Sequence, residues 1–143
     1  MVKTQPIHDV AVLFTHHADD ATTQNNIAVL KHYNPDVPVI PISQWGVTLP
    51  GGYNARAMTA GWRKLLPSYR GHDIKGAIRR FRQQIDPRWV WRNADLSAYL
   101  WVTWPKRPVQ AKRWVIFEWD MYASVSVRDF YRDVWDEDIV RSF

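Results

Sequence analysis

The sequence predicts a single α/β domain with three layers, α/β/α, around a small and mostly parallel sheet. Val10–Phe14 is a short continuous apolar run, which is typical of a strand covered on both faces. Asp19 or Asp20 can then cap a helix that reaches Tyr33, and Val37–Ile42 is a second short strand. A strand, a helix and a strand within about 35 residues form a βαβ unit, in which the two strands are parallel.

The rest of the chain continues this alternation of strands and helices. Prolines in the second strand indicate an edge position or an irregular ladder. A turn is predicted over Thr15–Ala18 and a loop over Ser43–Tyr53. Between them and the end of the chain, the predicted elements are helices over Ala55–Leu66 and Ile74–Ile85, a short strand at Arg88–Trp91, a helix capped by Asn93 that carries Leu96, Tyr99, Leu100 and Trp104, and a buried last strand at Trp114–Glu118. A capping box at Ser126–Asp129 then opens a final helix, whose Val127, Phe130 and Val134 are expected to point inward.

Residues 1–143 have the length and composition of one folded domain. Apolar residues make up 46% of the chain, which argues against disorder. The absence of cysteine excludes disulfides, thiolate catalysis and cysteine-based zinc sites. A net charge of +5 favours an anionic partner, such as nucleic acid, a phosphorylated ligand or a membrane surface. The apolar run Val10–Phe14 is too short for a signal peptide or a membrane span, so a cytoplasmic protein without a transmembrane segment is expected.

Acidic side chains lie at a strand end, where ligands of open parallel sheets bind. Thr15–Asp20 follow the first strand, and Glu118-Trp119-Asp120 ends the last one. On an extended backbone the two carboxylates of this triplet project to the same side and can face one cation. Such hard oxygen ligands suit Mg²⁺ or Mn²⁺, and the alternative is that both are solvated residues. His16–Asp20 also contains metal-capable side chains, but neighbours on a turn diverge, so we favour a strand end followed by an acidic helix cap.

An apolar strand that ends in acid-x-acid, here Glu118-Trp119-Asp120, resembles the DxD motif of the GT-A glycosyltransferases. Val10–His17, followed by the capped helix and the second strand, resembles the opening nucleotide-binding βαβ unit of that fold. Trp91–Trp101 is similar to the helix before the DxD strand in several GT-A families, with Arg92 and Asp95 near its start. The resemblance covers only the nucleotide-binding half of the fold.

The resemblance, which spans residues 8–123, implies a site for a nucleoside diphosphate sugar and a role for each matched residue. Asp120 and Glu118 would hold Mn²⁺ or Mg²⁺ on the diphosphate, and Glu118 would also lie toward the ribose or the sugar. Arg92 would neutralise phosphate, and Asp95 would approach the nucleoside or the sugar. The base would be framed by Thr15, His16, His17 and Asp19. The implied chemistry is glycosyl transfer, in which the metal stabilises the leaving diphosphate as a Lewis acid.

Two departures from the family pattern bear on activity. The triplet begins with Glu in place of Asp, and only 23 residues follow Asp120, where GT-A enzymes build the acceptor site. We therefore expect nucleotide-sugar binding and leave sugar transfer by this chain open. Two alternatives stay open: the chain is the nucleotide-binding half of such a fold, which a homodimer or another chain could complete, or it is a reduced relative of these enzymes.

A second function class stays open beside nucleotide-sugar binding. Arg63–Arg82 is a basic region with interleaved aromatic residues, which suits a non-catalytic binding module for nucleic acid or a protein partner. The same pattern also describes the solvated face of an amphipathic helix. Because the sequence has no RNP-like strand, GxxG loop or zinc-ligand spacing, nucleic acid is the less favoured partner.

Overall fold

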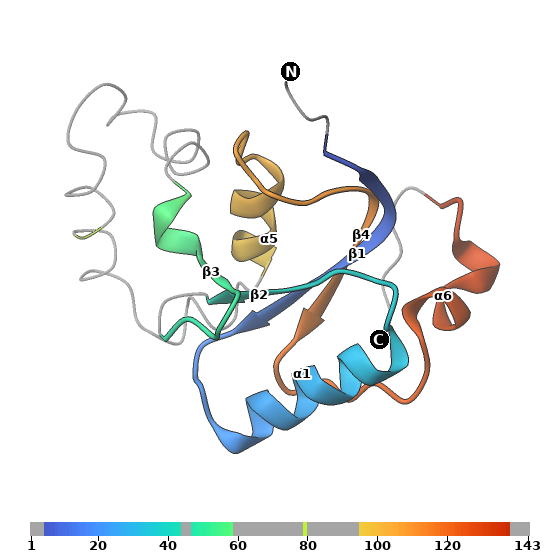
Figure 1. Ribbon diagram of the computed structural model, residues 1–143, viewed down its shortest axis with the longest axis horizontal. Coiled ribbons are helices and arrows are strands. Elements are labelled where there is room, and N and C mark those ends of the chain that lie inside the picture. Colours follow the sequence, from blue (N-terminus) through green and yellow to red (C-terminus); the bar gives the residue numbers. More distant parts are fainter. Residues whose placement is uncertain (1–4, 44–46, 59–78, 80–94, 138–143) are drawn as a thin grey trace.

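The computed structural model describes residues 5–43, 47–58, 79 and 95–137, which form a small parallel sheet with helices packed against it (Figure 1). Within these residues the sheet has four strands in the order β3-β2-β1-β4, and each neighbouring pair is parallel. The strands are β1 (Ile7–His16), β2 (Val39–Ser43), β3 (Tyr53–Asn54) and β4 (Gln110–Glu118). The helices are α1 (Ala21–Tyr33), α5 (Asp95–Val102) and α6 (Val127–Phe130), with short 3-10 turns η1 (Ala55–Ala57) and η3 (Arg132–Val134). The predicted α/β class is confirmed for these residues.

The βαβ unit at the start of the chain forms as predicted. Helix α1 begins after Asp20, whose Oδ1 accepts the backbone N–H of Thr23 at 2.8 Å. The helix ends at the buried Asn34, whose side-chain amide donates to the Leu30 carbonyl at 2.8 Å. The Asn34 Oδ1 also accepts the Val127 N–H at 2.9 Å, which ties the end of α1 to the start of α6. Asn34 can be buried because its amide and carbonyl groups both have partners.

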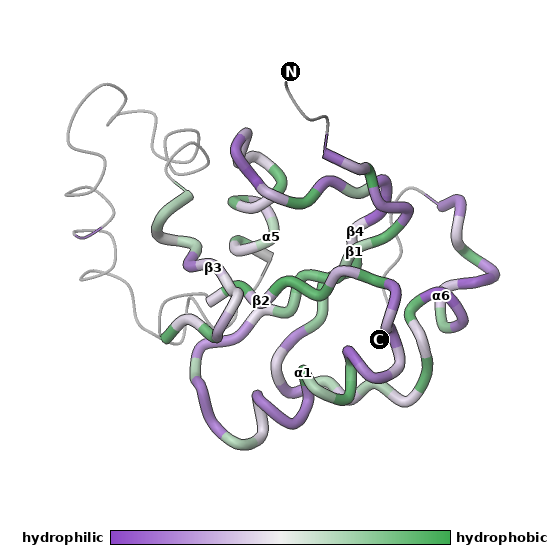
Figure 2. The backbone as a smooth tube through the Cα atoms, in the orientation of Figure 1, coloured by the Kyte–Doolittle hydropathy of each residue, from purple (hydrophilic) through white to green (hydrophobic). Residues whose placement is uncertain are grey.

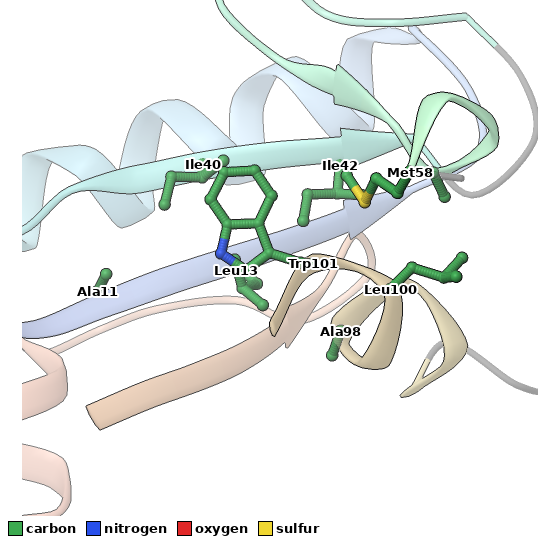
Figure 3. Packing of buried hydrophobic residues seen from close by; sticks show 9 residues of the cluster. Ala11, Leu13, Ile40, Ile42, Met58, Ala98, Leu100 and Trp101 are labelled. Atoms are coloured by element: carbon green, nitrogen blue, oxygen red, sulfur yellow. The ribbon is translucent and has the colours of Figure 1, made fainter. Parts of the chain in front are cut away.

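Side chains of β1 alternate between two hydrophobic clusters. Its odd-numbered residues Ala11 and Leu13 belong to the cluster around α5, and its even-numbered apolar residues belong to the cluster around α1 and α6. Figure 2 shows the hydrophobic stretches along β1 and β2, at the centre of the molecule. Trp101 of α5 is fully buried and lies over the sheet beside Ile40 and Leu13 (Figure 3). Truncating such a side chain to alanine typically lowers the free energy of unfolding by about 3–5 kcal/mol, so the packing of Trp101 stabilises the contact between α5 and the sheet.

The strands differ from the predicted ones at their ends and in their burial. Thr15 and His16 belong to β1 and not to the predicted turn, because their pairing with β2 continues as far as Ser43. Strand β2 lies inside the sheet, although β3 pairs with it only after Pro41, which has no N–H to donate. Strand β4 is the outer strand of the described sheet, and its Ile116 is 43% exposed. The expectation that the last strand is buried is therefore wrong.

Two aromatic residues of the predicted helices are exposed, and for Phe130 the expectation that it points inward is wrong. Tyr99 is exposed because α5 buries Ala98 and Trp101, three positions apart, on its other side. Phe130 is exposed at the end of the four-residue α6, although Val127 is buried as predicted. Apart from residues 55–58 and Arg79, the helices predicted over Ala55–Leu66 and Ile74–Ile85 and the strand at Arg88–Trp91 lie outside the described residues. Within the part of the chain that is described, no helix is long and apolar enough to cross a membrane.

Candidate functional site

The strand order reverses at β1. Strands β2 and β3 follow on one side of it, and β4 lies on the other side. In open parallel sheets ligands bind at such a switch point, outside the carboxyl ends of the strands. The register pairs Thr15 with Glu118, so the ends of β1 and β4 are next to each other. We call Thr15–Asp20 together with Glu118–Asp120 the switch-point site.

Three contacts hold the switch-point site in place, and one of them lies directly between its two halves. The Thr15 hydroxyl donates to the Phe117 carbonyl at 3.5 Å, and the Asn26 side-chain amide of α1 donates to the Trp119 carbonyl at 2.8 Å. The rings of His17 and Trp119 meet edge to face, with their centroids 4.9 Å apart. The turn after β4 is thereby attached both to the end of β1 and to the first half of α1.

Asn26 is a positioning residue that the sequence reasoning missed. It is buried on the same side of α1 as Ile27 and Leu30, facing the sheet. A buried polar side chain needs a hydrogen-bond partner, and the Trp119 carbonyl is that partner. The signal that could have found it is an asparagine next to the apolar positions of an amphipathic helix.

His16 is a buried side chain at the end of β1. It is 0% exposed, and its Nδ1 donates to the Ala18 carbonyl at 3.1 Å. Because a carbonyl can only accept, this bond places the ring proton on Nδ1. Among the described residues, His16 Nε2 has no hydrogen-bond partner. Burial lowers the pKa of His16, while the Ala18 hydrogen bond and the charge of Asp19 oppose that effect.

The acid-x-acid triplet does not have the extended backbone that the sequence predicted. Strand β4 ends at Glu118, and Trp119 and Asp120 form a turn that the Met121 N–H closes by donating to the Glu118 carbonyl at 3.0 Å. The same-side projection of alternate residues does not apply here, since it holds only along a continuing strand. Both carboxylates are exposed at the end of the sheet. The described ranges contain no group of three or more histidine or acidic side chains that could hold a metal ion.

The two acidic residues before α1 accept different hydrogen bonds. Asp20 caps the helix, and the backbone N–H of Thr23, followed by its hydroxyl, lowers the pKa of Asp20. The Asp19 carboxylate accepts the side-chain amide of Gln24 at 2.7 Å on the surface. The interpretation of this segment as a strand end followed by an acidic helix cap is therefore confirmed for Asp20.

The remaining predicted residues come from parts of the chain that are only partly described. Asp95 is the first residue of α5, and Arg92 lies outside the described residues. Of the basic region Arg63–Arg82, only Arg79 is described. The roles predicted for these residues stay predictions.

Comparison with known proteins does not assign the chain to a family. No protein-family model matches it, and neither a curated protein nor a solved structure gives a significant match. The argument for function therefore depends on the site itself.

Proposed function

We propose that this chain binds a nucleoside diphosphate sugar at the switch-point site, as the nucleotide-binding half of a three-layer, GT-A-like domain. The observation that carries the proposal is the reversal of strand order at β1, which brings Thr15–Asp20 beside Glu118–Asp120. Hydrophobic clusters around α5 and around α1 and α6 support the three-layer arrangement. Sugar transfer is the activity that the resemblance implies, and it needs an assay of its own.

The charge of the switch-point site makes the proposed binding depend on a divalent metal ion. Asp19, Asp20, Glu118 and Asp120 are all exposed acids at this end of the sheet. A diphosphate is itself anionic, so these carboxylates repel it unless a cation lies between them.

Glu118 and Asp120 fit such an ion. Proteins hold Mg²⁺ with one or two carboxylates, and substrate phosphates and waters complete its coordination. Two carboxylates are therefore enough protein ligands for Mg²⁺. In the described residues, no third metal-capable side chain is grouped with them. When bound, Mg²⁺ or Mn²⁺ would supply Lewis-acid stabilisation of the diphosphate.

The residues of the β1 end have two kinds of role in this proposal. Thr15 and His16 are buried, so they act by holding the end of β1 in place. His17 and Asp19 are exposed and are the members of the turn that can contact a ligand. The attachment of Trp119 to Asn26 keeps the Glu118–Asp120 turn close to them.

Thermal unfolding with Mg²⁺ or Mn²⁺ and a panel of nucleoside diphosphates and their sugars tests the proposal. A ligand at about 100 times its dissociation constant should stabilise the fold by about 2.7 kcal/mol, a shift of several degrees. We expect a shift that needs both the metal and one nucleotide. The Asp120→Ala variant should lose it, whereas Asp133→Ala, an exposed acid of η3, should keep it.

Other outcomes contradict the proposal. A metal-dependent shift that survives in Asp120→Ala would place the site elsewhere. No shift with any member of the panel, together with nucleic-acid binding that weakens steeply with salt, would favour the basic binding module.

A further inference from the structure

The outer edge of β4 presents backbone groups for pairing. In the described part of the chain, no strand pairs with β4 on the side away from β1, so about half of its N–H and C=O groups point outward. The strand is nine residues long and contains no proline, which is a common means of protecting an edge. An exposed strand edge of this kind can accept another strand.

We propose that a second copy of this chain occupies this edge, with the two β4 strands antiparallel across a two-fold axis. An axis normal to the sheet keeps each side chain on its own face, so even-numbered residues oppose even-numbered residues. With the axis at Val115, Lys112 lies opposite Glu118 and Trp114 lies opposite Ile116, and symmetry repeats each pair. Opposite charges across an antiparallel pair stabilise it, and like charges destabilise it.

The charges of β4 select this register over its neighbours. An axis at Trp114 would oppose Lys112 with Ile116 and leave the charge without a cross-strand partner. An axis at Ile116 would oppose Lys112 with Asp120, which lies in the turn beyond the end of β4. Of these three registers, the one about Val115 alone places the exposed Lys112 opposite the exposed Glu118 within the strand.

Exposure on the single chain agrees with the same register. Lys112 and Glu118 are exposed, and Ile116 is 43% exposed although it is the apolar centre of this face of β4. Placing Trp114 of the second copy against Ile116 removes apolar surface from water. The inference uses only β4 and does not depend on the proposed ligand.

A disulfide across the axis tests the pairing directly, because the chain has no cysteine of its own. Opposed residues of antiparallel strands have Cα atoms about 4.5–5.5 Å apart, within the range that a disulfide spans. We expect Val115→Cys in the full chain to give a covalent dimer under mild oxidation. Val47→Cys, which places a thiol at an exposed position outside β4, is the control and should stay mostly monomeric. Equal cross-linking of the two variants would overturn the proposal.

Charge reversal tests the register by sedimentation velocity. Lys112→Glu and Glu118→Lys each create two pairs of like charges, so each should raise the dimer dissociation constant about tenfold or more. The double variant K112E/E118K restores opposite charges and should return the constant toward the wild-type value. Lys106→Glu, the same charge change on an exposed lysine outside β4, should leave it unchanged.

Several results would overturn the inference, with circular dichroism confirming that each variant is folded. The first is a wild-type chain that sediments as a monomer up to millimolar concentration. The second is a single charge reversal that leaves the dimer dissociation constant unchanged. The third is a double variant whose dissociation constant is no lower than those of the single variants.

Discussion

The two ends of the sheet use their acidic residues differently. At the amino end, the Asp9 carboxylate pairs with Arg113 at 2.7 Å and with Arg128 at 3.1 Å. Arg113 also donates to the Trp135 carbonyl at 2.8 Å, and its guanidinium lies over the Trp135 ring. These bonds join the start of β1, the start of β4 and the C-terminal segment, which are far apart in the sequence.

At the carboxyl end, the described bonds of the acids before α1 go to uncharged donors. Asp20 accepts the Thr23 N–H, and Asp19 accepts the Gln24 amide. Such bonds shape the turn without neutralising its charge. The amino end is therefore arranged for stability, while the bonds of Asp19 and Asp20 at the carboxyl end leave the charge of these two residues in place, as the proposed binding of a cation requires. Four measurements, from the largest expected effect to the smallest, test this comparison.

Asn34→Ala should destabilise the amino end most. The change leaves the Leu30 carbonyl and the buried Val127 N–H without their side-chain partner, which should lower the free energy of unfolding by about 3 kcal/mol. Denaturant unfolding measures it. Asn25→Ala, on the exposed side of α1, should cost less than about 0.5 kcal/mol. Similar costs for the two variants would remove the stabilising role given to this junction.

Arg113→Ala should cost less, because Arg113 and Asp9 are both partly exposed. We expect a loss of about 1–2 kcal/mol in the free energy of unfolding, part of which disappears at high salt. Arg132→Ala, which breaks a more exposed pair with Asp129 inside the C-terminal segment, should cost less than about 0.5 kcal/mol. A loss for Arg132→Ala as large as that for Arg113→Ala would contradict the special role of the amino end.

The burial of His16 predicts a pH dependence of stability. Its pKa is lower in the folded chain than the ordinary value of 6.5, so the unfolded chain binds the proton more readily. The contribution of His16 is therefore complete above about pH 6.5 and is lost as the pH falls toward the folded pKa. Unfolding measured from pH 8 to pH 5 should show this loss, and His16→Gln should show a smaller slope. An unchanged slope would assign the dependence to other groups.

Asp120→Ala should have the smallest effect on stability. Asp120 is exposed in a turn, so the free energy of unfolding should change by less than about 0.5 kcal/mol. Asp9→Ala should cost more, since it leaves Arg113 and Arg128 without their shared carboxylate. Paired denaturant curves of the two variants measure the contrast. An Asp120→Ala loss equal to that of Asp9→Ala would show that acids at both ends serve stability.

Local chemistry allowed some elements to be predicted closely. Helix α1 starts after Asp20 because a carboxylate at that position satisfies a backbone N–H of the first turn. It ends before Pro35 because the residue preceding proline disfavours helical angles. The Ser126 hydroxyl likewise accepts the Asp129 N–H at 3.1 Å and starts α6. Each of these signals is complete within a few neighbouring residues.

Features that depend on distant neighbours were predicted poorly. The apolar run of β4 suggested a buried strand, but β4 is the outer strand and exposes Ile116. Thr15 and His16 were expected in a turn, and pairing with β2 extends β1 through them. The acid-x-acid triplet was expected to stay extended, whereas the chain turns at Trp119. In each case the outcome follows from which segment lies alongside, and the residues of one segment do not carry that information.

The sequence by itself determined the α/β class, the opening βαβ unit and the two helix caps, because those features depend on hydrogen bonds and steric limits between near neighbours. Tertiary structure alone decided the order of the strands. That order sets the Thr15 hydroxyl against the Phe117 carbonyl, 102 positions away, and buries His16 at the switch point. It also leaves the edge of β4 open to pairing in the described sheet. The physical reason is that strand pairing is set by which surfaces can be buried together, and that requires the whole folded chain.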